Sequence, residues 1–377
     1  MRIAILTFHK AHNCGAMLQA WALKTALEGM GHTVGFPDCN HVGVMPRFYS
    51  FSSPRSGIRR FLSWLNWLRI QILSLGSVDG RCRMHEKFKK MHLPEFHVSS
   101  NEIGVHFDIA VFGSDQIWNP IHLDKSDARL FLGETLTESF PRISYAASQG
   151  DVPPPDDWRE RMKAAANRFS ALSVREVSTG LGLVDHENRA PVVVADPSLL
   201  VTRREYMDIA RQHRMRTGKY LLVYTLCPRP IVCECAQKAA RELNIPVVIL
   251  CMYQYGLYKC PKDVKIAFGP AEWLAWIRDA EAVISMSFHG TVFAAMFGKP
   301  FVSVRLGRDN METRVSTFIN AIGESACRIV TPDVEPKDWL PFLRQSLNPS
   351  VEGKLVEMRE QSLSWLKSAL GEIQLHN

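Results

Sequence analysis

The amino-acid sequence predicts an α/β protein of two Rossmann-like, doubly wound domains, with the active site in the cleft between them. Residues 2–7 form a short apolar strand, and a polar loop with a glycine connects it to a helix at 17–30. The same alternation restarts after Leu200. Its strands and helices fall at 220–225, 231–243, 246–250, 271–279 and 282–284. A chain of 377 residues also exceeds the comfortable size of one hydrophobic core.

The expected division of the chain follows from these two series. The N-terminal α/β domain spans 1–200 and carries a basic, helical insertion at about 46–90. The C-terminal α/β domain spans 201–345, with the linker near 197–203. The remaining residues, 346–377, show helical periodicity and are predicted to fold back over the first domain.

Composition narrows the class of protein. A hydrophobic content of 46% with 22% charged residues is typical of a soluble globular chain. The first apolar run ends at His9 and Lys10, too early for a signal peptide or a membrane span, so we expect a cytoplasmic protein. Nine cysteines are scattered between Cys14 and Cys327 without Cys-x-x-Cys spacing, which favours reduced, structural thiols.

The net charge of +7 is concentrated in one segment. Between residues 46 and 90 there are ten Lys or Arg residues against two acidic ones, and the rest of the chain is close to neutral. This argues against a nucleic-acid groove and for one local basic surface. Within it, residues 55–73 interleave basic, aromatic and aliphatic side chains. Such a helix can lie in a membrane interface or pack on its own domain.

Two loops of the first domain follow apolar strands and carry polar side chains. After the first strand, Asn13 and Gly15 are candidate ligand contacts, and the alternative is a simple tight turn. After the strand at 107–112, an aspartate, amides and an indole come together in a way that suits a sugar. These residues are Ser114, Asp115, Gln116, Trp118 and Asn119. The alternative is a turn aspartate that bonds its own backbone.

Two further segments supply candidates for binding an anion. A short strand at 171–176 delivers Arg175, which binds an anion or pairs with Glu176 or Asp196. Residues 284–304 read as a strand end, a polar turn, an apolar helix and a new strand. Its turn and helix carry Ser287, His289, Gly290, Thr291 and Lys299. A helix N-terminus suits phosphate or carboxylate, and the alternative is that His289 only caps or packs.

No metal site is predicted. His9 and His12 stand three residues apart, but no carboxylate or cysteine partner accompanies them in a metal-ligand pattern.

Five segments can be compared together with a known family. They are residues 1–23, which include His-Asn-Cys-Gly-Ala-Met-Leu-Gln; 112–120, Phe-Gly-Ser-Asp-Gln-Ile-Trp-Asn-Pro; 144–150; 173–176 with Asp196-Pro197; and 287–304. In order and content they resemble the polysaccharide pyruvyl transferase family. The resemblance covers residues 1 to about 325 and is weakest between 40 and 100. Cys14 and Gln149 depart from it, since an aromatic residue is expected at both positions.

The resemblance implies a GT-B-like fold and a reaction. The pyruvyl group of phosphoenolpyruvate passes to a sugar of a polysaccharide, or of its lipid-linked precursor, as a cyclic ketal, and phosphate is released. The first domain would hold the acceptor and the second the donor. Neither cofactor nor metal is expected, because cations and a helix dipole can carry the phosphate charge. Related chains act in exopolysaccharide and capsule assembly.

Roles for individual residues follow from this reaction. His289 is the expected general acid for the donor's methylene carbon, and Asp115 the base that deprotonates or orients a sugar hydroxyl. Arg175 joins them as the third catalytic residue. The expected donor-binding residues are Arg175, Ser287, His289, Gly290, Thr291, Lys299 and Arg314. The expected acceptor-binding residues are Asn13, Gly15, Ser114, Asp115, Gln116 and Trp118.

Two other functions remain compatible with the sequence. A GT-B glycosyltransferase would use the same helix N-terminus for a nucleotide sugar. A non-catalytic glycan-binding or assembly protein would bind no donor. The basic segment 55–73 would in either case allow peripheral contact with the inner face of the cell membrane.

Overall fold

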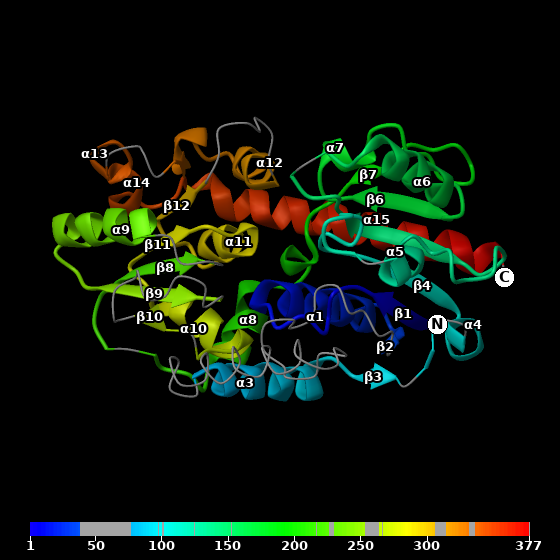
Figure 1. Cartoon of the computed structure of the whole chain (residues 1–377), viewed down its shortest axis with the longest axis horizontal. Coiled ribbons are helices and arrows are strands. Elements are labelled where there is room, and N and C mark those ends of the chain that lie inside the picture. The colour runs from blue at the N-terminus through cyan, green and yellow to red at the C-terminus, as the bar shows by residue number, and fades with distance from the viewer. Residues whose placement is uncertain are drawn as a thin grey trace, which may run out of the picture.

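Two parallel β-sheets lie side by side, each covered by helices (Figure 1). The computed structural model describes residues 1–37, 77–96, 98–99, 102–123, 125–151, 153–215, 217–225, 230–252, 264–265, 267–305, 314–331 and 336–376. Within them the fold is α/β, as the sequence predicts.

The first sheet has seven strands in the order β3-β2-β1-β4-β5-β6-β7, all paired in parallel. Its strands are β1 (Arg2–Leu6), β2 (Thr33–Pro37), β3 (Glu95–Phe96), β4 (Ile109–Phe112), β5 (Arg142–Ala147), β6 (Ala171–Val174) and β7 (Val192–Val193). The helices of this half are α1 (Cys14–Gly29), α4 (Ile103–His106), α5 (Lys125–Phe131), α6 (Asp156–Ala166) and α7 (Val177–Gly180). Its central strand β4 is apolar throughout, and β1 is apolar after Arg2, because helices cover both faces of the sheet.

The second sheet repeats this winding with six strands in the order β10-β9-β8-β11-β12-β13. They are β8 (Leu221–Thr225), β9 (Val247–Cys251), β10 (Val264–Lys265), β11 (Ala282–Ser285), β12 (Phe301–Val304) and β13 (Ile329–Val330). The helices are α8 (Arg203–Ala210), α9 (Pro230–Leu243), α10 (Pro270–Asp279), α11 (Phe288–Met296), α12 (Arg314–Ala321), α13 (Pro336–Trp339) and α14 (Pro341–Arg344), with short 3₁₀ turns η2 (Pro197–Leu199) and η4 (Ala326–Arg328).

The strand orders decide where ligands can bind. In the first sheet the winding reverses between β1 and β4, and in the second between β8 and β11. Ligands of such sheets bind beyond the carboxyl ends of the strands at this reversal. The loops after β1 and β4 carry Asn13 and Asp115, and His289 lies in the first turn of α11, the helix that follows β11. These sequence-predicted residues therefore stand at the reversal points of both sheets.

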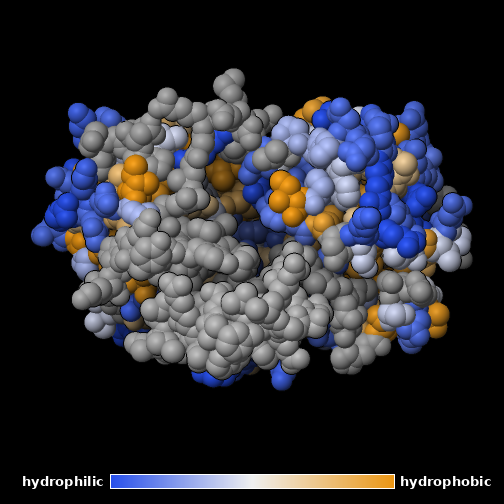
Figure 2. Space-filling model, in the orientation of Figure 1, coloured by the Kyte–Doolittle hydropathy of each residue, from blue (hydrophilic) through white to orange (hydrophobic). Residues whose placement is uncertain are grey.

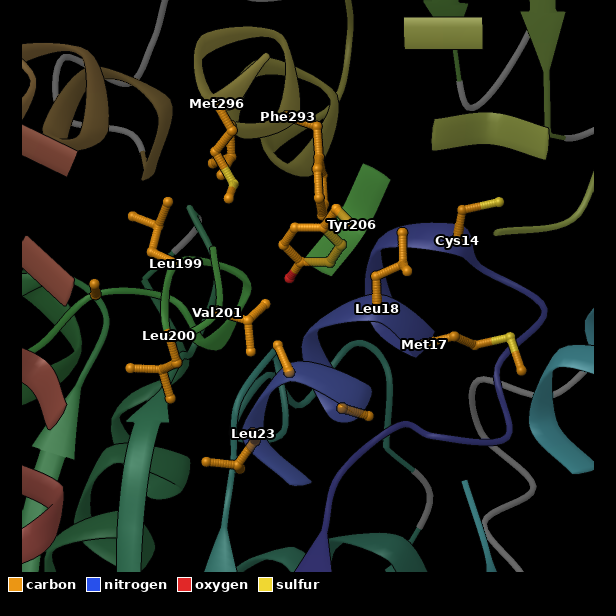
Figure 3. Close-up of a cluster of buried hydrophobic side chains, with 14 of the residues drawn as sticks. Cys14, Met17, Leu18, Leu23, Leu199, Leu200, Val201, Tyr206, Phe293 and Met296 are labelled. Atoms are coloured by element: carbon orange, nitrogen blue, oxygen red, sulfur yellow. The ribbon is translucent and has the colours of Figure 1, made fainter. Parts of the chain in front are cut away.

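The two halves share a hydrophobic interface. Figure 3 shows Leu18 of α1, Leu199 of η2, Tyr206 of α8 and Phe293 of α11 gathered in one cluster. The ring of Tyr206 meets that of Phe293 edge-to-face, with centroids 4.7 Å apart. Because this cluster is continuous, the relative position of the halves is fixed by packing as well as by the chain that links them.

Two long helices also cross between the halves. The last helix, α15 (Ser350–His376), runs from the second half to the first in Figure 1. Its Ser362 hydroxyl accepts a hydrogen bond from the Ala195 amide at 2.9 Å, and its Glu372 pairs with Arg189. The C-terminal helix therefore packs on the first domain.

The second crossing helix is α3 (Ser77–His92), which lies below both halves in Figure 1. Its buried Arg81 donates to the Met252 carbonyl at the end of β9. On the side of the first domain, Glu86 accepts from His12 at 2.9 Å and His85 lies 3.6 Å from the Cys14 sulfur. The C-terminal part of the predicted basic insertion thus ties the loop before α1 to the second domain.

The predicted membrane-contact segment, 55–73, lies outside the described residues. In the part of the chain that the structure describes, no helix combines the length and the apolar character needed to cross a membrane. Helix α6 begins after Pro155, and Asp156 and Asp157 lie in its first turn without capping it.

Candidate active site

His289 is held at the N-terminus of α11, where the two halves meet. Ser287 is the N-cap residue of this helix, and its side chain makes no capping bond. The imidazole is buried, and its Nε2 lies 3.6 Å from Oδ2 of Asp196 in the other half. This Nε2 finds no hydrogen-bond partner among the described residues. A buried donor without a partner is a natural position for a ligand contact.

Gly15 makes room for this histidine. A Cβ at Gly15 would come within 2.4 Å of Cγ and Nδ1 of His289, which no side chain tolerates. Asn13 caps α1 by accepting from the amides of Gly15 and Ala16, at 3.0 and 3.2 Å. The glycine that the sequence proposed as an acceptor contact therefore serves first as the surface against which His289 packs.

Asp196 is the centre of a buried charge cluster. Its Oδ2 accepts from Nη1 of Arg175 at 2.9 Å and lies 3.3 Å from the Ser114 hydroxyl, while Oδ1 accepts from the amide and hydroxyl of Ser198. Burial by itself would raise the pKa of Asp196. The charges of His289 and Arg175 outweigh it and hold the pKa of this carboxyl well below its usual range. Asp196 is therefore a fixed negative charge between Arg175 and the imidazole of His289.

Arg175 offers an open hydrogen-bonding edge. Nη1 binds Asp196, and the Nε atom lies 3.5 Å from Glu176, yet neither Nε nor Nη2 makes a hydrogen bond among the described residues. Burial by itself lowers the pKa of Arg175. The charges of Glu176 and Asp196 have the larger, opposite effect, so the pKa is raised and the group stays cationic. Its guanidinium carbon lies 4.8 Å from the centre of the Phe288 ring. Arg175 is both an ion-pair partner and a donor still available to an anion.

Asp115 stands in the loop after β4 in a left-handed conformation, with φ of 71°. Aspartate tolerates this region better than most residues. One carboxylate oxygen accepts from the Gln116 amide at 2.9 Å. The turn interpretation is thus correct for part of the side chain. Asp115 also acts electrostatically on Arg175 and on His122, which places its charge in the same cluster.

Arg314 reaches the cluster from the first turn of α12. It forms a salt bridge with Asp151 of the first domain at 2.9 Å, and its guanidinium carbon lies 5.8 Å from the Phe288 ring centre. Figure 2 shows that the surface is hollowed between the two halves.

Several sequence-predicted site residues lie elsewhere. Trp118 is buried in the core, donates to the Phe131 carbonyl at 3.0 Å and packs on Phe169, so it has no face for a sugar. Ser114 is fully buried beneath Asp196 and Ala146. The amide group of Gln116 accepts from Asn119, at 2.7 Å, at the edge of the loop. The sequence identified the loop but not which of its side chains turn into the core.

Three further predicted donor contacts, Gly290, Thr291 and Lys299, lie in α11 or just after it. Gly290 packs so closely that a Cβ would meet the Ser285 hydroxyl at 2.3 Å. The Thr291 hydroxyl is buried between the Ser287 carbonyl and Ser303. Lys299 follows the C-terminal end of the helix, where Arg203, Asp279 and Glu281 are its charged neighbours. Gly290 and Thr291 thus directly follow His289 in α11, and Lys299 lies beyond the opposite end of that helix.

The sequence also missed residues that the structure brings together. Asp196 was considered only as a partner of Arg175, and Phe288 and Asp151 were not considered. The Asp196-Pro197 pair before a short turn was the available signal for Asp196, because its side chain caps η2. No local signal marks Phe288 or Asp151, since their roles depend on contacts between the domains. Among the described residues, no group of three or more His, Cys, Asp or Glu side chains is arranged to hold a metal ion.

The family model described as polysaccharide pyruvyl transferase matches residues 13–307. The chain belongs to this family. The match includes Asn13, Asp115, Arg175, Asp196 and His289, and ends before Arg314. Membership makes the protein a transferase of polysaccharide pyruvylation in general terms, with a polysaccharide or sugar as acceptor. No curated protein matches the chain significantly.

Solved structures add evidence on the fold of this pyruvyl transferase family member. A protein assigned as UDP-N-acetylglucosamine 2-epimerase from Listeria monocytogenes superimposes with a TM-score of 0.57 at 9% identity, covering 100% of this chain and 97% of that one. The UDP-GlcNAc 2-epimerase of Methanocaldococcus jannaschii, solved with UDP-GlcNAc and UDP, gives 0.51 at 14% identity, covering 97% and 100%. At such identities the likeness concerns the fold, which is GT-B.

Proposed function

We propose that the protein transfers the pyruvyl group of phosphoenolpyruvate to two hydroxyls of one sugar, in a polysaccharide or its lipid-linked precursor. The product is a cyclic ketal, and phosphate leaves. One observation carries the proposal: the unbonded nitrogens of His289 and Arg175 are buried beside the same carboxylate, that of Asp196. This carboxylate lies where the two halves meet. The free N–H groups of a cationic guanidinium, next to an imidazole, suit a small substrate that carries two anionic groups.

The donor's anionic groups would be bound from both halves. Nε and Nη2 of Arg175 are positioned to bind two oxygens of one phosphate or carboxylate. The N-terminus of α11 contributes its dipole and amides, which the Ser287 side chain leaves uncapped. Ser287 is therefore retained as a donor contact, together with Arg175 and His289.

His289 is the general acid of this proposal. Its Nε2 gives a proton to the methylene carbon of the donor, which becomes the methyl group, and positive charge develops on the adjacent carbon. Asp196, 3.6 Å away, orients the ring and is placed to stabilise its cationic form. The first sugar hydroxyl attacks that carbon and loses its proton to Asp115. The carbon–oxygen bond to phosphate then breaks, and the second hydroxyl closes the ketal as its proton passes to the departing phosphate.

The acceptor would approach from the first domain, along the loops that carry Asn13 and Asp115. Asp115 acts as base or orients a hydroxyl, with an effect of about 10²-fold if it acts as the base. Gly15 contributes through the room it leaves for His289.

Phosphate release from phosphoenolpyruvate in the presence of candidate sugars tests this function. A thermal shift with phosphoenolpyruvate, and none with UDP-sugars, separates it from a nucleotide-sugar glycosyltransferase of the same fold. The reverse pattern would replace the proposal with that alternative. Binding of neither donor would favour the non-catalytic glycan-binding protein.

A further inference from the structure

We propose that Asp151 and Arg314 form a positioning pair that holds the two halves of the active site in register for transfer. The proposal rests on the function proposed above. It gives Arg314 a different role from the donor contact that the sequence suggested, and it assigns a role to Asp151.

The pair joins the domains by three hydrogen bonds. Oδ1 of Asp151 accepts from the backbone amide and from Nε of Arg314, both at 3.1 Å, and Oδ2 accepts from Nη2 at 2.9 Å. The carboxylate thus binds both the guanidinium fork and the first turn of α12. Burial raises the pKa of Asp151, but the contact with Arg314 outweighs it, so the pKa lies below its ordinary value and the carboxyl stays charged.

On the first domain, Asp151 ends a loop that also fixes the catalytic candidates. The Ser148 amide donates to the Asp115 carbonyl at 3.2 Å, and the Arg175 amide donates to the Ala147 carbonyl at 3.1 Å. Gly150, with φ of 86°, packs so closely that a Cβ would lie 2.5 Å from the Gln116 side chain. The position of Asp151 is therefore rigidly related to the positions of Asp115 and Arg175.

On the second domain, Arg314 is linked to His289 through packing. Helix α12 lies against α11, and the ring of Phe318 meets that of Phe288 edge-to-face with centroids 6.2 Å apart. Phe288 precedes His289 in the chain, and its ring meets the imidazole at 5.3 Å. A force on Arg314 is thus transmitted to the helix that presents His289.

A comparison of Arg314 with Arg175 indicates the role of Arg314. Nε and Nη2 of Arg314 are both bound to Asp151, whereas the same two atoms of Arg175 are unbonded among the described residues. Nε and Nη2 of Arg175 can therefore bind the substrate phosphoenolpyruvate, whereas the same atoms of Arg314 are occupied by Asp151 of the other domain. Arg314 therefore acts on turnover through domain register rather than through donor affinity.

The test compares Asp151→Asn, Arg314→Gln and the double variant with wild type in phosphate release. Each single variant should lower kcat by at least about tenfold, because misplacing reacting groups by even 1 Å is costly. The apparent KM for phosphoenolpyruvate should change by less than about threefold. The double variant should be no slower than the slower single variant, since both break one contact. Arg189→Gln, which breaks the ion pair with Glu372 far from the cleft, is the matched control and should keep wild-type turnover.

Small-angle X-ray scattering supplies a readout that needs no activity. Loss of the pair should raise the radius of gyration in both single variants and not in Arg189→Gln. Wild-type turnover in Asp151→Asn would overturn the proposal. So would a roughly tenfold rise in donor KM in Arg314→Gln without one in Asp151→Asn, which would make Arg314 a donor ligand. If wild type releases no phosphate, the proposed function fails, and an unchanged radius in both variants would then overturn the positioning pair separately.

Discussion

Gly15 of the first domain packs directly against His289 of the second, so the fit of the two halves of the site depends on this one residue. Replacing Gly15 by Ala puts a methyl group 2.4 Å from the imidazole, so the ring must move from Asp196. We expect kcat to fall by about 10²-fold, as for a misplacement of about 1 Å. Steady-state phosphate release measures it.

Gly29→Ala is the control for this change. It lies in the same helix and has no atom within 4 Å of the new methyl group, so it should retain full activity. Unimpaired turnover in Gly15→Ala would contradict the observed packing as a requirement for catalysis.

His289→Ala removes the proposed general acid. Phosphate release should drop by at least about 10²-fold, the lower range for a positioned acid. The variant should still fold, with a lower melting temperature, because the buried Asp196 loses the imidazole beside it. Near-normal turnover in a folded variant would exclude the role.

Asp196→Asn tests the buried charge cluster through stability. The native pKa of Asp196 is depressed, so its charge stabilises the fold above the unfolded pKa of about 4, and this stabilisation is lost as pH falls towards the native value. At pH 7 the variant should lose about 3 kcal/mol of unfolding free energy, since the buried Arg175 loses one of the two carboxylates that neutralise it. Chemical denaturation from pH 7 to pH 3 should show the gap to wild type narrowing below about pH 4.

The exposed Asp157→Asn serves as comparison and should differ from wild type by less than about 0.5 kcal/mol. A gap for Asp196→Asn that widens towards acid pH would contradict the assignment of a fixed charge.

Residue by residue, the sequence predicted what a strand end reveals and missed what only tertiary packing reveals. Strand, polar turn and helix signals placed Asp115 and His289 at carboxyl ends of strands. The same signals could not tell that Trp118 turns into the core or that Lys299 stands at the other end of α11, because neither facing direction nor helix length is visible in a motif.

Among the elements, α3 connects the two halves, a role that its basic composition did not predict. The sequence presented residues 46–90 as a basic surface, yet the helix at its end is a crossing element that contacts both α1 and α10. Hydrophobic periodicity could not predict this, since the decisive contacts are polar ones of Arg81, His85 and Glu86 with loops distant in sequence.

Arg81→Met tests this crossing helix. The change removes the donor to the Met252 carbonyl and should lower the free energy of unfolding by about 2 kcal/mol. Arg83→Met, an exposed position on the same helix, should shift it by less than about 0.5 kcal/mol. Urea denaturation of both variants decides the matter, and equal stabilities would show that α3 contributes little through this contact.

For the whole molecule, the strand orders explain why so much of the fold was predictable. Two βα series of similar length can wind in only a few ways, and right-handed crossovers place both reversal points on ligand loops. The relative placement of the halves was not predictable, because it depends on the shared cluster of Figure 3 and on the pairs Asp196–His289 and Asp151–Arg314.

The central claim is that the inter-domain cluster around His289 moves a pyruvyl group from phosphoenolpyruvate to a sugar. Mass spectrometry of sugar acceptors incubated with the protein and phosphoenolpyruvate tests it most directly. We expect an acceptor that carries one pyruvyl ketal with wild type and no such product with His289→Ala. Transfer of a glycosyl group from a nucleotide sugar, with no ketal on any acceptor, would contradict it.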